Sequence, residues 1–340
     1  KYQDFSVKLV YSQGKFGVGF DSERSTSFPN DSDPSGWQSA SFATVDAKNG
    51  KATLPTVAND DLDRSDSHQP VQAAVSTPIA TPDGFFVAWS DTRTAEPVPY
   101  DVNAAYYSGI YGMPFALDGK AATYDDVQVE QMDIPYGFAG VATAKGILMA
   151  WGGRNPDSTE AWLYTRSGPA DGEFTIASPG DPIAKWTGPI AKMGESLTGA
   201  LGADGNVLFV FETWDASDDA DSLSAVVVDA KGKLVANNLL ATKKGTTFGL
   251  ASVTATPNGY VVAYASVTNP LTTPVEYDTV HLASVDASGN VDTSNDPAAT
   301  VDGGNVQSLA ASVDANGIAS VYVASGAAPE LSLRSLTVCP

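Results

Sequence analysis

The sequence has few of the residues that would cross-link the fold or attract anionic partners. Its single cysteine, Cys339, cannot form an intramolecular disulfide. Lys and Arg together number 19 against 40 Asp and Glu, which gives a formal net charge of −21. Such a surface repels phosphate groups, so we expect neither nucleic acid nor an anionic membrane as a partner. The sequence also contains no run of about 18 apolar residues, the length that predicts a membrane span.

Glutamate is scarce among the acids, with 9 Glu against 31 Asp. Aspartate favours turns over helix interiors, and the sequence is otherwise rich in Val, Thr, Ser and Gly. This composition predicts an all-β protein. The sequence begins at Lys1 rather than Met, which we interpret as a removed signal peptide or a fragment. Together with the acidity, this predicts a secreted or cell-surface location.

One pattern recurs along the whole chain: a strand of small and apolar residues, a turn containing glycine, and a second strand. This pattern predicts β-hairpins. A looser copy opens the chain at 6–20, and the clearer copies are 75–93, 137–154, 197–214, 250–267 and 309–326.

Each turn glycine is followed, five or six positions later, by an aromatic residue. The glycines stand at positions 14, 84, 146, 205, 259 and 317. We interpret the aromatic residues as packing between neighbouring repeat units, because a large ring buries much apolar area. They are Phe20, Trp89, Trp151, Phe211, Tyr264 and Tyr322.

A second hairpin follows the first in each unit, although the last unit ends after one strand of it. Two hairpins in a period of about 40 to 60 residues are typical of propeller blades. The chain therefore resembles a six-bladed β-propeller with four-stranded antiparallel blades in a single domain; the alternative is a pair of β-sandwiches. The predicted blades are 6–58, 71–125, 137–180, 197–240, 248–295 and 307–338.

The two ends of the predicted blades differ in loop length. Short turns join the first strand to the second and the third to the fourth. Long polar connections join the second strand to the third, and each blade to the next. Binding residues usually gather on long loops held by a rigid scaffold, so we expect any site at this end. Examples are 21–36, 59–70, 91–101 and 265–278.

The acidic connections are candidates for a Ca²⁺ site, because Ca²⁺ prefers carboxylate and carbonyl oxygens. The densest run is at 215–222, where the candidate ligands are Asp215, Asp218, Asp219 and Asp221. No EF-hand loop is present, and the alternative is a solvated acidic loop. Trp214 precedes this run and is a candidate sugar platform, with semi-buried packing as the alternative.

Three of the six arginines, Arg24, Arg93 and Arg154, follow a repeat aromatic by three or four positions. Guanidinium groups from several blades resemble the way sialidases, which are also six-bladed, hold the carboxylate of their sugar. The Arg-Ile-Pro segment and the S-x-D-x-G-x-T-W boxes of that family are absent. The alternative is local pairing that braces a loop, between Asp91 and Arg93 or between Asp21 and Arg24.

The two histidines give little support for catalysis. His68 and His281 are more than 200 residues apart, and no G-x-S-x-G motif accompanies them. His281 stands in an alternating strand, where we expect a structural role.

Three functions remain open. The first is a non-catalytic propeller that binds a glycan or a surface protein through its long acidic loops, with Ca²⁺ assistance. The second is a carbohydrate-active enzyme of sialidase-like or other glycosidase type. The third is a structural spacer in a larger surface protein. A shared fold does not decide among them.

Overall fold

The computed structural model describes a set of segments that together hold the regular structure of the chain. All of their elements are β-strands, and none of these segments contains a helix long and apolar enough to cross a membrane. The described residues are 7–24, 37–57, 73–91, 107–122, 127–133, 137–154, 161–169, 174, 181–186, 197–215, 220–268, 276–294, 299–301, 305–314, 316, 318–327 and 330–338.

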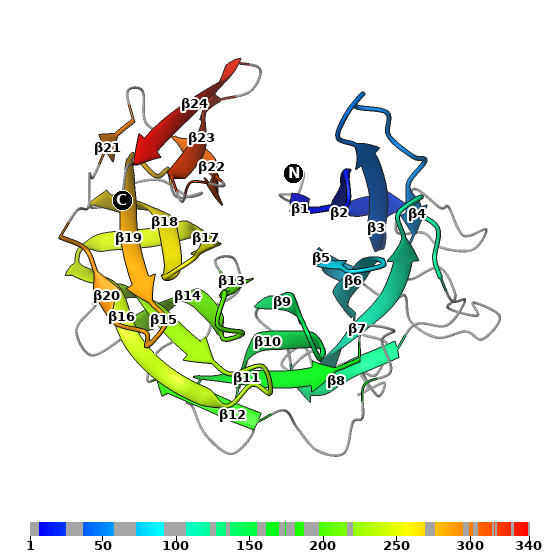
Figure 1. The fold of residues 1–340 in the computed structure, drawn as a ribbon, viewed down its shortest axis with the longest axis horizontal. Coiled ribbons are helices and arrows are strands. Elements are labelled where there is room, and N and C mark those ends of the chain that lie inside the picture. Colours follow the sequence, from blue (N-terminus) through cyan, green and yellow to red (C-terminus); the bar gives the residue numbers. More distant parts are fainter. Residues whose placement is uncertain are drawn as a thin grey trace, which may run out of the picture. The chain divides into compact units, whose positions relative to one another are not determined.

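The strands form six antiparallel sheets of consecutive strands, numbered here from 1 to 6 (Figure 1). Sheet 1 contains β1 (Val7–Ser12), β2 (Lys15–Arg24), β3 (Trp37–Asp46) and β4 (Thr56–Val57). Sheet 2 contains β5 (Ala73–Thr81), β6 (Gly84–Asp91), β7 (Tyr107–Ala116) and β8 (Val127–Asp133). Sheet 3 contains β9 (Gly137–Thr143), β10 (Gly146–Arg154), β11 (Ala161–Gly168) and β12 (Asp181–Trp186).

The remaining sheets continue in chain order. Sheet 4 contains β13 (Thr198–Leu201), β14 (Val207–Asp215), β15 (Ala220–Val228) and β16 (Leu234–Lys244). Sheet 5 contains β17 (Thr246–Thr256), β18 (Gly259–Thr268), β19 (Thr279–Asp286), β20 (Val291–Asp292) and β21 (Ala299–Thr300). Sheet 6 contains β22 (Val306–Val313), β23 (Ala319–Ala327) and β24 (Glu330–Val338). The all-β class and the six repeat units predicted from the sequence are therefore confirmed.

Contacts divide the chain into two compact units. Unit 1 holds residues 1–135, 145–147 and 166–180, and unit 2 holds 136–144, 148–165 and 181–340. Within unit 1, β5 packs against β1, β2 and β3. Within unit 2, β13 packs against β9 and β17, and β17 packs against β22. In both units, the first strand of one sheet therefore adjoins the first strand of the next.

The second strand of sheet 4, β14, begins with a continuous apolar run because both of its faces are buried. In β14, Phe209 and Phe211 pack in a cluster with residues of sheet 3. The alternate residues Leu208 and Val210 pack in a second cluster with Tyr264 and other residues of sheet 5. A strand that is covered on both faces reads as a continuous apolar run rather than an alternation.

Three of the second strands begin with a glycine that no other residue replaces easily. Gly84, Gly146 and Gly259 have φ values of 157°, 127° and 151°. A Cβ on any of them would overlap a carbonyl oxygen of the third strand, those of Phe115, Gly168 and Val285 respectively. These glycines thus permit close backbone approach where the hairpin enters the sheet.

The strand count and the boundaries differ in part from the prediction of four strands per blade. Sheet 5 has five strands and sheet 6 has three. The fourth strands of sheets 2 and 3 begin only after the predicted blade ends at 125 and 180, and that of sheet 4 runs past 240. In sheet 2 the turn after β7 is tight, because Phe115 forms an isolated bridge with Ala121, but regular pairing with β8 begins only at Val127.

Three of the six repeat aromatics, Trp89, Phe211 and Tyr264, pack against residues of the preceding sheet. Phe20 and Trp151 hold the equivalent place in their strands, whereas Tyr322 does not. Trp89 and Trp151 are fully buried, whereas Tyr322 is 42% exposed, and Val323 takes the buried position instead. The turn before β23 has the same length as the turn before β14, since Asp314 N–H donates to Ile318 O as Gly202 N–H donates to Asn206 O. Phe211 stands six residues after its turn glycine but Tyr322 only five, and a difference of one residue in a strand moves a side chain to the other face.

Candidate functional site

At one end of the sheets, aspartates close the tight turns with their own side chains. Asp286 Oδ1 accepts hydrogen bonds from the backbone N–H groups of Ser288 and Asn290, both at 2.8 Å. Such bonds define Asx turns, which give a turn its shape without any ligand. The same arrangement occurs at Asp229 and Asp314, and at Asp46 the two donors are the second and third residues after it.

These bonds also stabilise the charged form of the turn aspartates. The Asn290 side chain lowers the pKa of Asp286, and the Lys15 ammonium, 2.8 Å from Asp46, lowers the pKa of that carboxyl. The oxygens of these aspartates are thus used within their own turns or sheets.

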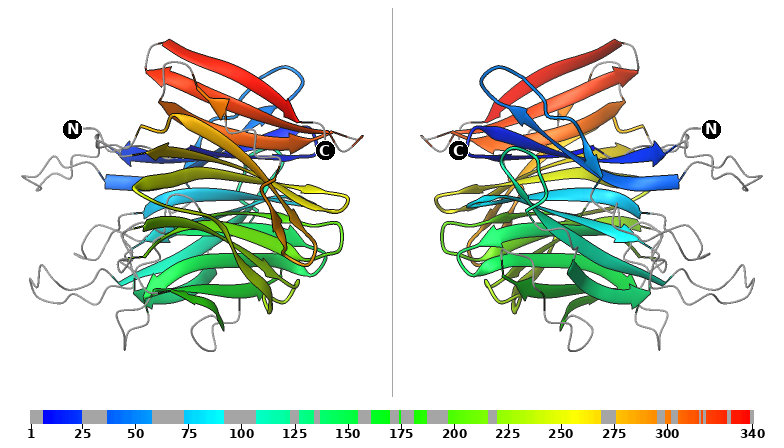
Figure 2. Two further views of the ribbon diagram at one scale, coloured as in Figure 1. Left: turned by 90° about the vertical axis from the view of Figure 1, so that its left-hand side faces the viewer. Right: turned by 90° about the vertical axis from the view of Figure 1, so that its right-hand side faces the viewer.

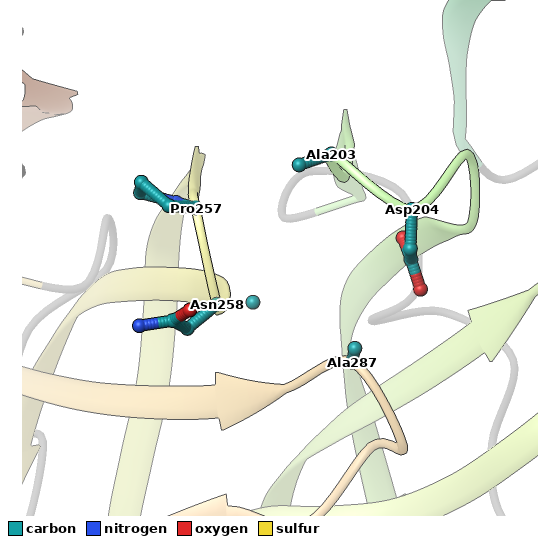
Figure 3. A pocket seen from close by; sticks show the side chains of 6 residues that line it. Ala203, Asp204, Pro257, Asn258 and Ala287 are labelled. Atoms are coloured by element: carbon teal, nitrogen blue, oxygen red, sulfur yellow. The ribbon is translucent and has the colours of Figure 1, made fainter.

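A shallow depression of about 300 Å³ lies at this end in unit 2, between the turns that contain Asp204, Asn258 and Ala287 (Figure 3). Its one carboxylate, Asp204, accepts hydrogen bonds from the backbone and side-chain amides of Asn206, at 3.1 and 2.7 Å. Because that carboxylate is already hydrogen-bonded to Asn206, we interpret the depression as a gap between turns rather than as a binding site.

The opposite end of the sheets holds the buried carboxylates that the structure describes. They are Asp21, Glu212 and Asp221, whose exposed fractions are 9%, 6% and 5%. Asp21 and Glu212 lie near the end of the second strand and Asp221 near the start of the third, so all three flank the connection between those strands. Buried acids require partners, so they mark places where adjoining segments meet in a fixed arrangement.

In unit 1, Asp21 links sheet 1 to sheet 2. Its Oδ1 accepts a hydrogen bond from Ser76 N–H at 3.0 Å, and Ser76 Oγ donates to Ser41 O at 3.1 Å. Ser76 lies where the register of β5 on β6 shifts, between Ala74 and Thr77. A bulge leaves a backbone N–H outside the ladder, and the Asp21 carboxylate accepts from it.

Lys8 lies beside this junction. Its ammonium donates to Thr77 Oγ1 at 3.0 Å. Burial lowers the pKa of Lys8 to about 8, and the Asp21 carboxylate partly opposes that shift. The junction thus holds a lysine with a lowered pKa, of about 8, next to an acid fixed by backbone hydrogen bonding.

In unit 2, Glu212 occupies the same position in sheet 4 that Asp21 occupies in sheet 1, directly after the repeat aromatic. It pairs with Leu223 of β15, and it follows Leu208 and Val210 on the face that packs on sheet 5. Asp221 lies on the same face, two residues before Leu223. The alternation of strand residues therefore turns both buried carboxylates toward sheet 5.

Sheet 5 presents polar groups on the facing surface. Ser266 Oγ and His281 Nε2 share a hydrogen bond of 2.8 Å. The His281 ring stacks on Tyr264, with a centroid distance of 4.8 Å and an interplanar angle of 8°. Ser266 is only 6% exposed, so a substrate has no access to its hydroxyl. This arrangement supports the structural role predicted for His281.

The ligand-binding residues predicted from the sequence fall at strand ends or outside the described residues. Arg24, Asp91 and Arg154 are each at the carboxyl end of the second strand of their sheets, where the backbone alone is described. Trp214 pairs with Asp221 in the β14–β15 ladder. Arg93 lies outside the described residues.

Two of the four predicted Ca²⁺ ligands, Asp215 and Asp221, lie among the described residues. Asp215 ends β14, whereas Asp218 and Asp219 lie outside the described residues. Asp221 is described, and it is buried rather than solvated. Within the described segments, no group of three or more His, Cys, Asp or Glu side chains is placed to hold a metal ion. The Ca²⁺ site remains a prediction.

The sequence interpretation missed Lys8 and Glu212, and it considered Asp21 only as a local partner of Arg24. A signal for the two acids was available, since both stand directly after a repeat aromatic. Lys8 carried no such signal, because a lysine in an alternating strand is usually exposed.

Comparison with known proteins shows the class of fold. No family model matches the sequence, and no curated protein matches it. Among solved structures, Trypanosoma rangeli sialidase matches at 9% identity with a TM-score of 0.52, over 96% of this chain and 53% of that one. Its complex with sialic acid matches at 10% identity with a TM-score of 0.52, over 97% and 53%. A puromycin hydrolase S511A mutant matches at 17% identity with a TM-score of 0.51, over 99% and 44%.

The protein is therefore a six-bladed β-propeller in fold class, as its six antiparallel sheets also indicate. The chain spans about half the length of these matched proteins. Identities this low show a common fold and carry no residue-level correspondence.

Proposed function

We propose that this protein is a non-catalytic binding propeller, which recognises a glycan or a surface protein at the end that carries the long connections. The proposal rests on a difference between the acidic residues at the two ends of the sheets. Aspartates at the tight-turn end are engaged in their own turns, as at Asp286. Buried polar residues at the other end fix the strand ends from which the long connections leave, as Asp21 does.

A rigid base is what a binding loop needs, because ordering a loop on binding costs conformational entropy. The connections that leave β2, β6, β10 and β14 span 25–36, 92–106, 155–160 and 216–219, and these connections with the strand ends before them carry most of the candidate ligand groups. Asp215, Asp218 and Asp219 would bind Ca²⁺ there, and Arg24, Arg93 and Arg154 would contact a carboxylate of the ligand. A secreted or cell-surface location fits the acidic composition.

Two features argue against catalysis as the first choice. The one Ser–His pair that the structure describes is buried against Tyr264. The sequence also lacks the motifs of the sialidase family, even though the fold is similar. A glycosidase remains the second candidate, favoured by the equivalent places of Arg24 and Arg154 at the ends of second strands.

A glycan array probed with labelled protein, in calcium and again in EDTA, tests the proposal. Binding in both solutions supports a glycan ligand, and binding lost in EDTA also supports the Ca²⁺ site. Double substitution of Arg93 and Arg154 by Ala is expected to weaken binding. A fluorogenic sialoside serves as the enzyme assay: turnover abolished by the same substitutions would replace the binding proposal with the glycosidase. If the protein binds neither glycans nor cell-surface proteins, the structural spacer would be the remaining function.

A further inference from the structure

The outermost strand of sheet 4 is unusually long. This strand, β16, has 11 residues, whereas the fourth strands of sheets 1, 2 and 3 have 2, 7 and 6 (Figures 1 and 2). Sheet 4 has four strands in chain order, so β16 is an outer strand of a regular sheet. It lies wholly within unit 2, as do the parts of sheets 4 and 5 that it contacts.

One face of β16 packs on sheet 5. Leu240 is buried in the cluster that sheets 4 and 5 share, and Ala236 and Ala241 pack against that cluster. Asn238 Nδ2 donates a hydrogen bond of 2.7 Å to Gly289 O, in the turn between β19 and β20. These contacts fix β16 against sheet 5 along the middle of the strand.

The opposite face of β16 exposes aliphatic side chains. Leu234 pairs with Val228, whose side chain belongs to the cluster with sheet 3, and Leu239 lies on the same face of the sheet. The two leucines are 41% and 59% exposed, and Val235, the extra residue of a bulge, is 49% exposed. In the fourth strands of sheets 1, 2 and 3, no large apolar side chain that the structure describes is exposed to this extent. Exposed aliphatic side chains that gather in one place indicate an interaction surface.

The charge around β16 is opposite to that of the whole chain. The segment 230–275 contains no Asp or Glu, although the chain has 40 of them. It contains four lysines in two pairs, Lys231 and Lys233 directly before β16 and Lys243 and Lys244 at its end, and all four are exposed. No ion pair among the described residues engages these four ammonium groups. This local positive charge favours an acidic partner.

The spacing of the lysine pairs restricts the shape of that partner. At about 3.3 Å per residue, the pairs lie roughly 30 Å apart along the strand, with the exposed aliphatic side chains between them. A partner that meets both pairs is therefore long and narrow, as an extended polypeptide is. An anionic membrane is a plane, and it would also meet the surrounding surface of a chain whose net charge is −21.

We propose that β16 is a docking surface for an extended acidic segment of a partner polypeptide. Aliphatic side chains in the middle of the segment contact Leu234 and Leu239, and carboxylates at its two ends pair with the two lysine pairs. The apolar contacts contribute affinity, and the charges select the partner and its register. This surface is a second binding surface, in addition to the one of the proposed function.

The test uses the full chain and a fluorescent peptide of 11 residues, the length of β16, with aspartates at both ends and alternating Val and Thr between them. Fluorescence anisotropy should show saturable binding that weakens as salt is added, because exposed charges are screened. The double change Lys243→Glu and Lys244→Glu should weaken binding about tenfold or more, and so should Leu239→Asp. A peptide of the same composition with its aspartates in the centre should bind about tenfold more weakly.

The matched control is the double change Lys48→Glu and Lys51→Glu, which alters the charge equally at two exposed lysines in the turn after β3. It should bind the peptide like the unmodified protein, and circular dichroism should show that all variants are folded. Equal binding by the two double variants, equal binding of the two peptides, or no saturable binding overturns the proposal.

Two further measurements separate other occupants of the surface. Binding to phosphatidylserine vesicles without binding of the peptide would make an anionic membrane the partner. Self-association in sedimentation that Leu239→Asp abolishes would make the partner a second copy of this chain. Either result also overturns the proposal.

Discussion

Asp21 of β2 accepts a hydrogen bond from the backbone N–H of Ser76 in β5, at 3.0 Å, so a carboxylate of one sheet fixes a bulge in the next. Asp21→Ala would leave that buried N–H without its acceptor. We expect a loss of about 2 kcal/mol in the free energy of unfolding, measured by urea denaturation. Asp21→Asn keeps an oxygen at this place and should recover at least half of the loss. Equal losses in the two variants would mean that the negative charge, not the hydrogen bond, is what matters.

The lowered pKa of Lys8 predicts a rise in stability with pH. Its ordinary pKa is 10.5 and its folded value is about 8, so between these values the unfolded chain binds more protons than the folded one. The free energy of unfolding should therefore rise from pH 8 toward pH 10, by an amount on the order of 1–2 kcal/mol.

Lys8→Met should remove this rise, as measured by urea denaturation across the same range. Tyr260 acts in the opposite direction only above about pH 10, since burial raises the pKa of its phenol. The prediction is wrong if the Met variant and the unmodified protein show the same slope between pH 8 and pH 10.

Gly259→Ala should destabilise the protein far more than Gly205→Ala. Both glycines have positive φ, 151° and 85°, but a Cβ at Gly259 would overlap Val285 O, whereas one at Gly205 meets nothing within 4 Å. We expect losses of about 3 kcal/mol and about 1 kcal/mol respectively. Thermal unfolding of the two variants decides between backbone strain alone, which predicts similar losses, and strain combined with overlap.

The one-residue offset of Tyr322 predicts that the repeat aromatics are not equivalent in stability. Trp151 is fully buried and stacks on Tyr164 with an interplanar angle of 11°. Trp151→Ala should cost about 4 kcal/mol. Tyr322→Ala, at a side chain that is 42% exposed, should change stability by less than about 1 kcal/mol. A large loss at Tyr322 would show that its ring is covered in solution.

The fold was more accessible from the sequence than the candidate site. Hairpin turns and apolar strands are local features, so the spacing of Gly84, Gly146 and Gly259 indicated the repeat directly. The buried acids were not recognised, because the sequence does not state which acid faces a neighbouring sheet. Asp21 and Asp46 are both acids near strand ends, yet one is buried against Ser76 and the other is bound to Lys15 in an exposed turn.

By itself, the sequence determined the all-β class, the six repeat units and the turns that aspartate and glycine close, because each depends on residues a few positions apart. The tertiary structure alone decided what each strand face meets. Neighbouring sheets bury Leu223 and leave Leu333 exposed, and the register of β23 sets Val323 inward and Tyr322 outward. Burial depends on the partner across the interface, and nothing in the local sequence of a strand specifies that partner.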